Sequence, residues 1–195
     1  MKRFAAIFLI FAIMFSLSAC ARPFSDPKTL FKSPKISGDM QFIAEALDKA
    51  VDGSYELVSP TSGDYRTACT AVDLNSDGTT EYIVFYSLSN GEIHLVYISK
   101  AGDEWRVISD TSVSSNAIST LQFADLCKTN TLEIIIGDPL FSENQNQLSI
   151  FSVDTGELVC LAKESYTSFV ICNLTGGNKS QIFITEIGTV AESVP

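Results

Sequence analysis

The chain has 195 residues, of which 46% are hydrophobic and 18% charged, and its formal net charge is -10 at pH 7. Enough apolar residues are present for a packed core, which excludes an intrinsically disordered chain and is typical of one folded domain. The acidic balance argues against a nucleic-acid partner, because phosphate groups repel a surface of the same sign.

The first residues have the features of a bacterial secretion signal. Two basic residues precede an uncharged run, Phe4 to Leu17, which is shorter than the roughly 20 apolar residues of a membrane-spanning helix. Leu17-Ser18-Ala19-Cys20 follows and resembles the lipobox of bacterial lipoproteins. We therefore expect residues 1–19 to be a lipoprotein signal peptide and Cys20 to be lipidated. An ordinary cleaved signal with an incidental cysteine is the alternative.

The next two segments predict a tether and a helix. Residues 20–38 contain three prolines and many small or polar residues, as a tether between a lipid and a domain would. Within residues 39–53, Met40, Ile43 and Leu47 recur at helical spacing before Asp52-Gly53 ends the pattern. We expect one short helix there.

From residue 54 onward the sequence predicts short strands arranged as a repeat. DLNSDGTTEYIV at 73–84 aligns with DLCKTNTLEIII at 125–136 and with NLTGGNKSQIFI at 173–184. Each segment keeps Leu at its second position and Glu or Gln at its ninth, followed by strand-forming residues. The predicted strands are 66–73, 81–87, 92–99 and 104–109 in the first unit, 117–126, 132–137, 148–153 and 157–163 in the second, and 168–174 and 181–185 in the third.

Four-stranded units of about 50 residues have the size of β-propeller blades. We therefore predict a mainly β fold in which residues 54–195 form an incomplete β-propeller-like array of about two and a half four-stranded blades. A β-sandwich of short strands is the alternative. Since propellers have about four to eight blades, the sequence also predicts that the chain is a truncated product of a longer reading frame.

The loop of the first repeat has the pattern of a calcium site. Calcium prefers six to eight oxygen ligands, which short polar side chains at alternate positions of a tight turn can supply. The expected ligands are Asp73, Asn75, Asp77, the backbone carbonyl of Thr79, and Glu81. Val84 occupies the twelfth position, where an EF-hand needs glutamate, so an EF-hand is excluded. A metal-free turn is the alternative.

The corresponding loops of the other two repeats lack these ligands. Cys127 and Thr129 replace the second and third ligands in one loop, and Thr175 and Gly177 replace them in the other. The sequence therefore predicts a single structural calcium ion.

The D-x-N-x-D-G-x-x-E loop resembles those of FG-GAP or VCBS-type propeller repeats, as in integrin-like heads. With SPKISGDMQFIAEALDKAV at 33–51 and GDYR at 63–66, most of the mature chain is similar to uncharacterised lipoproteins of Firmicutes that carry such repeats. The resemblance implies a propeller architecture and an extracellular, lipid-anchored position on the outer face of the cytoplasmic membrane. It implies no settled activity.

Motifs of catalysis are missing from the sequence. His94, the only histidine, lies in a predicted strand, and the four cysteines that follow Cys20 have no C-x-x-C spacing. Trp105 and the tyrosines and phenylalanine at 82, 85, 86 and 97 are expected in the core.

We therefore predict a lipid-anchored cell-surface binding or scaffold module whose ligand is an unknown extracellular protein or glycan. The alternative is an accessory or catalytic carbohydrate-active surface protein whose active residues lie in further blades.

Overall fold

The computed structural model describes residues 38–114, 117–127, 129–139, 146–153, 156–174 and 180–186. These residues form one compact unit, which begins at Gly38. The predicted signal peptide, Cys20 and almost all of the predicted tether lie outside the described residues, as do Thr175 and Gly177 of the third loop.

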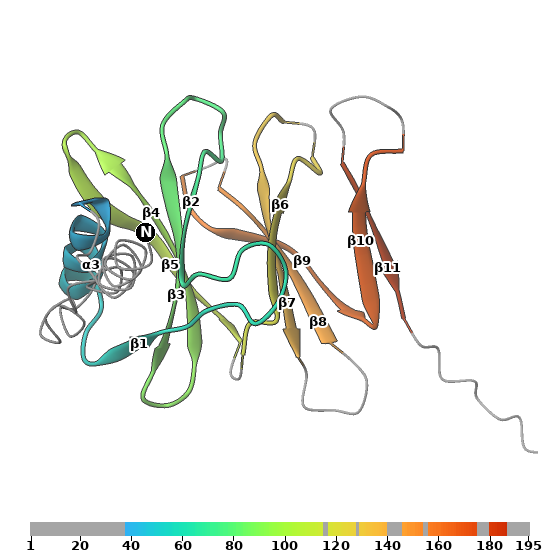
Figure 1. Ribbon diagram of the computed structural model, residues 1–195, viewed down its shortest axis with the longest axis horizontal. Helices are drawn as coiled ribbons and strands as arrows, with labels where there is room; N and C mark the ends of the chain where they lie inside the picture. Colours follow the sequence, from blue (N-terminus) through green and yellow to red (C-terminus); the bar gives the residue numbers. More distant parts are fainter. Residues whose placement is uncertain are drawn as a thin grey trace, which may run out of the picture. The chain divides into compact units, whose positions relative to one another are not determined.

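The described part of the chain is mainly β, with one helix and three antiparallel sheets, as Figure 1 shows. Helix α3 spans Gly38–Ala50, close to the prediction. The first sheet contains β1 (Tyr55–Leu57), β2 (Cys69–Val72), β3 (Glu81–Leu88), β4 (Ile93–Ala101) and β5 (Glu104–Ser114). The second contains β6 (Thr120–Ala124), β7 (Glu133–Pro139), β8 (Asn146–Ser152) and β9 (Val159–Tyr166), and the third β10 (Ser168–Cys172) and β11 (Gln181–Thr185).

Each predicted strand is present, and consecutive strands pair in the order β2-β3-β4-β5, β6-β7-β8-β9 and β10-β11. Strand β1 was not predicted and pairs with the far half of β3, from Leu57 opposite Tyr86 to Tyr55 opposite Leu88. Strands β1 and β2 therefore both pair with β3, each with a different part of it.

The first hairpin of each sheet has the same register. Val72 pairs with Glu81 in the first sheet, Ala124 with Glu133 in the second, and Cys172 with Gln181 in the third. In all three hairpins the two paired residues are nine positions apart in sequence. The three segments aligned in the sequence therefore occupy equivalent positions beside equivalent loops.

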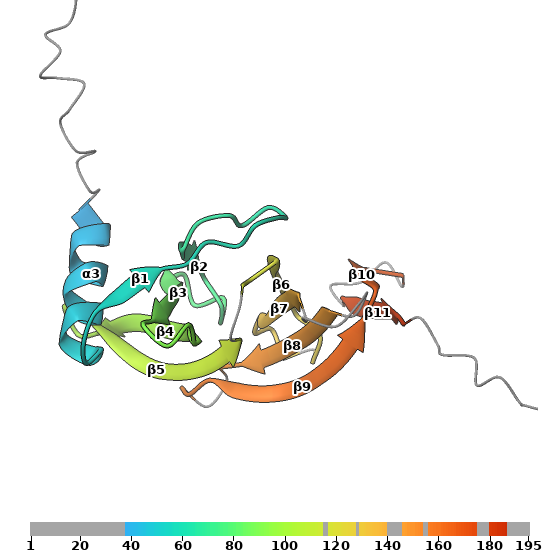
Figure 2. The same cartoon turned by 90° about the horizontal axis from the view of Figure 1, so that it is seen from below.

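The helix and the sheets pack as successive layers, which Figure 2 shows from another side. Ile43 and Leu47 of α3 cover one face of the first sheet, around Tyr82, Val84 and Val96. The other face of that sheet packs on the second sheet, with a core of Ile83, Phe85, Leu95, Ile134, Ile136 and Phe151. The far face of the second sheet packs on the third, with Ile135, Leu148 and Ile150 against Phe169, Ile171 and Ile182.

This layering explains the sequences of the central strands. Six consecutive residues are buried at the start of β3 (EYIVFY) and at the start of β7 (EIIIGD), because both faces of each strand are covered. Helix α3 is instead amphipathic, with Ile43, Ala46 and Leu47 buried. No helical segment in the described residues has the length and apolar character needed to cross a membrane.

Candidate functional site

The loop between β2 and β3, residues 73–81, folds back on its first residue. One carboxylate oxygen of Asp73 accepts a hydrogen bond from the backbone N–H of Asp77 (3.2 Å), and the other accepts one from Gly78 (3.0 Å). Gly78 has a φ of 82°, in the left-handed region that suits glycine. Asp73 and Gly78 together explain the tight turn.

Asn75 and Asp77 lie together inside this turn. The Asp77 N–H also donates to Asn75 Oδ1 (3.0 Å), and Asn75 Nδ2 donates to Asp77 Oδ2 (3.0 Å). The Thr79 N–H donates to Asp77 Oδ1 (2.6 Å). Hydrogen bonds from Thr79, and then from Asn75, hold the pKa of Asp77 below its ordinary value. The loop therefore keeps an exposed, ionised carboxylate at its centre.

Glu81 closes the loop from the strand side. Its side chain is only 2% exposed, and Oε2 accepts a hydrogen bond from the backbone N–H of Leu74 (2.9 Å). Burial raises the pKa of Glu81, the bond from Leu74 opposes that rise, and the negative charges of Asp77 and Asp73 add to it. Glu81 is thus near enough to Asp73 and Asp77 to be repelled by both.

The second hairpin contains a loop held by the same bonds. The Asp125 carboxylate accepts hydrogen bonds from the N–H groups of Thr129 (3.1 Å) and Asn130 (3.3 Å), and Glu133 Oε2 accepts one from Leu126 (2.6 Å). Asn130 replaces Gly78 and has a φ of 64°, which asparagine tolerates better than most residues.

A comparison of the two loops separates two roles. The first Asp and the ninth Glu accept the backbone hydrogen bonds that hold the turn in both loops, a role that does not depend on a metal. The first loop adds the Asn75 amide and the Asp77 carboxylate, which Cys127 and Thr129 replace in the second. These two residues are therefore the part of the pattern that is particular to the first loop, where they also hydrogen-bond within the turn.

The oxygen-rich composition of loop 73–81 fits a hard cation such as calcium. Two aspartates, an asparagine amide, a buried glutamate and the backbone of Thr79 lie within nine residues. Among the residues that the structure describes, no group of three or more His, Cys, Asp or Glu side chains forms a ready metal cluster. Amide and backbone oxygens would have to complete the shell.

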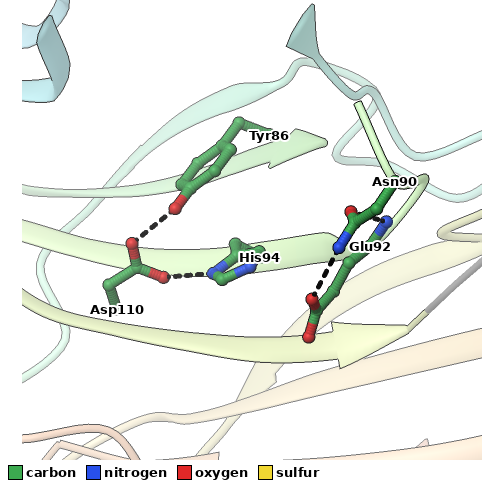
Figure 3. A network of polar contacts seen from close by, with 5 residues as sticks. All are labelled: Tyr86, Asn90, Glu92, His94 and Asp110. Atoms are coloured by element: carbon green, nitrogen blue, oxygen red, sulfur yellow. Dashed lines mark hydrogen bonds and ion pairs between the residues drawn. The ribbon is translucent and has the colours of Figure 1, made fainter. Parts of the chain in front are cut away.

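His94 belongs to a polar network across three strands of the first sheet, shown in Figure 3. His94 Nδ1 lies 2.7 Å from Asp110 Oδ1, and the Tyr86 hydroxyl donates to Asp110 Oδ2 (2.6 Å). The Tyr86 and His94 rings are stacked, with centroids 4.8 Å apart. In the same view, Asn90 and Glu92 are hydrogen-bonded to each other beside the turn from β3 to β4.

This network joins β3, β4 and β5. The remaining ring nitrogen of His94, Nε2, is buried and has no hydrogen-bond partner in the described part of the chain. A nucleophile activated by His94 would have to contact that nitrogen. The sequence-based interpretation of His94 as a strand residue fits this arrangement.

Asp138, near the end of β7, is an unusual residue that sequence reasoning missed. It is 1% exposed, and neither carboxylate oxygen has a hydrogen-bond partner among the described residues. Burial raises its pKa to about 7, although the positive charge of Lys163 opposes the rise. The sequence Gly-Asp-Pro is typical of an exposed turn. The structure instead places these residues in β7, where the Asp138 side chain is buried.

The aromatic residues are divided between the core and the surface. Phe85 and Tyr97 lie in the core between the first two sheets, and Tyr82 and Tyr86 lie beneath α3. Trp105 is only partly buried beside them.

No family model, curated protein or solved structure matches the chain.

Proposed function

We propose that this chain is a lipid-anchored binding or scaffold module on the outer face of the bacterial cytoplasmic membrane, and that one calcium ion stiffens its 73–81 loop. The observation that carries the calcium proposal is the difference between the two equivalent loops. Both use Asp and Glu to hold the turn, but only the first adds the side-chain oxygens of Asn75 and Asp77.

Calcium would be held by the side chains of Asp73, Asn75, Asp77 and Glu81 and by the Thr79 carbonyl. A divalent cation would offset the repulsion of Glu81 by Asp73 and Asp77 and would favour the ionised form of Glu81. The role of the metal is structural, because it would fix the entry into β3, an inner strand of the first sheet.

We further propose that the sheets are blades of a propeller-like array of the FG-GAP or VCBS type. Support comes from the consecutive pairing of four strands in the first two sheets, from the shared hairpin register, and from the face-to-face packing of neighbouring sheets. Loops 73–81 and 125–133 then lie at the same end of their blades. Such arrays present loops for binding.

The lipid anchor is proposed from Leu17-Ser18-Ala19-Cys20. Metabolic labelling with a clickable fatty acid should mark the wild-type chain in a bacterial host and should fail to mark Cys20→Ala. Equal labelling of the two chains would contradict the anchor.

A thermal melt with matched variants tests the calcium proposal. Asp77→Ala removes a candidate ligand, and Thr129→Ala changes the equivalent position of the second loop. Calcium at 100 times its Kd should stabilise the wild type and Thr129→Ala by about 2.7 kcal/mol relative to chelator, and should leave Asp77→Ala unchanged. If calcium and chelator give the same melting temperature for all three proteins, the calcium site does not exist.

A further inference from the structure

A groove lies between helix α3 and the hairpin that joins β4 to β5. Its volume is about 330 Å³, at the lower end of the roughly 300 to 1,000 Å³ typical of small-molecule sites. The helix contributes Phe42, Glu45 and Lys49 to the lining, and the hairpin contributes Lys100, Glu104 and Trp105. The groove therefore joins a helix face to a hairpin at the edge of the first sheet.

Two aromatic rings give the groove an apolar surface. Phe42 is 52% exposed, and the core face of α3 is formed by other residues, so the packing of the helix does not explain a phenylalanine here. Trp105 is held in place by the edge of Tyr82, with ring centroids 5.0 Å apart, and by Lys100 Nζ, which lies 5.0 Å from its ring centroid. One ring is fixed, and the other is largely open to solvent.

Charged groups of both signs surround these rings. Glu45, Glu104 and two aspartates supply acceptors, while Lys49 and Lys100 supply donors. Arg106 holds Glu104 at 2.9 Å and, with Lys49, keeps the pKa of Glu104 below its ordinary value. The rim can therefore both donate and accept hydrogen bonds at neutral pH.

These features disfavour cations, anions and wholly apolar ligands. A cation would compete with Lys100 for the Trp105 ring, an anion would face four carboxylates, and a wholly apolar ligand would strip water from charges without pairing them. A ligand with an apolar face and a hydroxyl-rich edge fits both the rings and the rim. Sugar rings have this two-sided character.

We propose that the groove between α3 and the β4–β5 hairpin binds a neutral saccharide, with Phe42 and Trp105 packing on the sugar face and the charged rim bonding its hydroxyls. This inference rests on the proposed binding function and gives that function a ligand class. The groove is separate from loop 73–81, so its occupancy does not depend on calcium by direct contact.

Trp105 is the only tryptophan of the chain, so its fluorescence reports on this groove directly. The full chain, in a detergent without a sugar headgroup, would be titrated with soluble N-acetylglucosamine, cello- and xylo-oligosaccharides. At least one series should change the emission saturably. Phe42→Ala should weaken that binding about tenfold, because it removes one of the two stacking surfaces. Leu57→Ala, at a 56% exposed residue that does not line the groove, should bind as wild type does.

Three outcomes would overturn the proposal. The first is the absence of saturable change with every oligosaccharide, and the second is binding that Phe42→Ala leaves intact. The third is a stronger, salt-sensitive response to a lysine-rich peptide, which would assign the groove to a basic partner. Titrations with calcium and with chelator keep the two proposals apart, since saccharide binding can fail while calcium still raises the melting temperature.

Discussion

Replacing Asp138 with Asn should remove a pH-dependent loss of stability. The Asp138 carboxyl is buried and has no hydrogen-bond partner among the residues that the structure describes, so the folded chain holds its proton up to a pKa of about 7, against an ordinary 3.8. Between these values the unfolded chain is ionised while the folded chain is protonated. Wild-type stability should therefore fall as the pH rises from about 4 to about 7, and the loss should be complete above that range.

The two pKa values set the size of this effect. They differ by about 3, and each tenfold change in proton affinity corresponds to 1.36 kcal/mol, so the ionised carboxylate costs the folded state on the order of 4 kcal/mol. Asp138→Asn keeps the shape of the side chain and cannot ionise. Its advantage over wild type should grow by about 1.4 kcal/mol per pH unit across the range.

Urea unfolding followed by far-UV circular dichroism at pH 4, 5.5, 7 and 8 measures the difference between the two chains. Asp64→Asn, at an exposed turn residue, is the matched control and should keep the wild-type pH profile. Parallel profiles of wild type and Asp138→Asn would refute a raised pKa of Asp138 in the folded chain, because Asp138 would then ionise at the same pH in both states.

Two further substitutions test the packing of the second sheet. Gly137→Ala should destabilise the chain by about 1 to 3 kcal/mol, since the added Cβ would lie 2.8 Å from Thr120 Cγ2 and against the Tyr166 hydroxyl; an unchanged melting temperature would show that these neighbours move aside. Glu133→Ala should cost about 1 to 3 kcal/mol and speed hydrogen exchange at the Leu126 amide, which loses its buried acceptor. Exchange at wild-type speed would mean that the loop bond is dispensable.

Local sequence predicts the strands well because the loops repeat. Asp73 and Glu81, and likewise Asp125 and Glu133, place each turn and the start of each second strand, so aligned segments give aligned hairpins. Helix α3 is found within a residue of the periodic segment Asp39–Val51. The positions of the helix, the strands and the loops can therefore be predicted from residues that are close in sequence.

Features set by distant contacts are not predictable in the same way. Strand β1 has three residues and no alternating pattern, and it exists because β3 offers Tyr86 to Leu88 as a free edge. Glu81 was predicted as a metal ligand from its spacing, and its hydrogen bond to Leu74 is visible only in the fold. The sequence did contain one sign that this glutamate also holds the turn. Glu133 recurs at the ninth position of loop 125–133, although Cys127 and Thr129 replace two of the expected ligands there.

Helix α3 also limits how an array of such sheets can grow. Ile43 and Leu47 occupy the face of the first sheet that corresponds to the face by which the second sheet packs on the first. Another sheet could stack there only by displacing the helix. Growth by addition of sheets is therefore directional, and a ring that included this chain would close through α3 rather than by direct contact between two sheets.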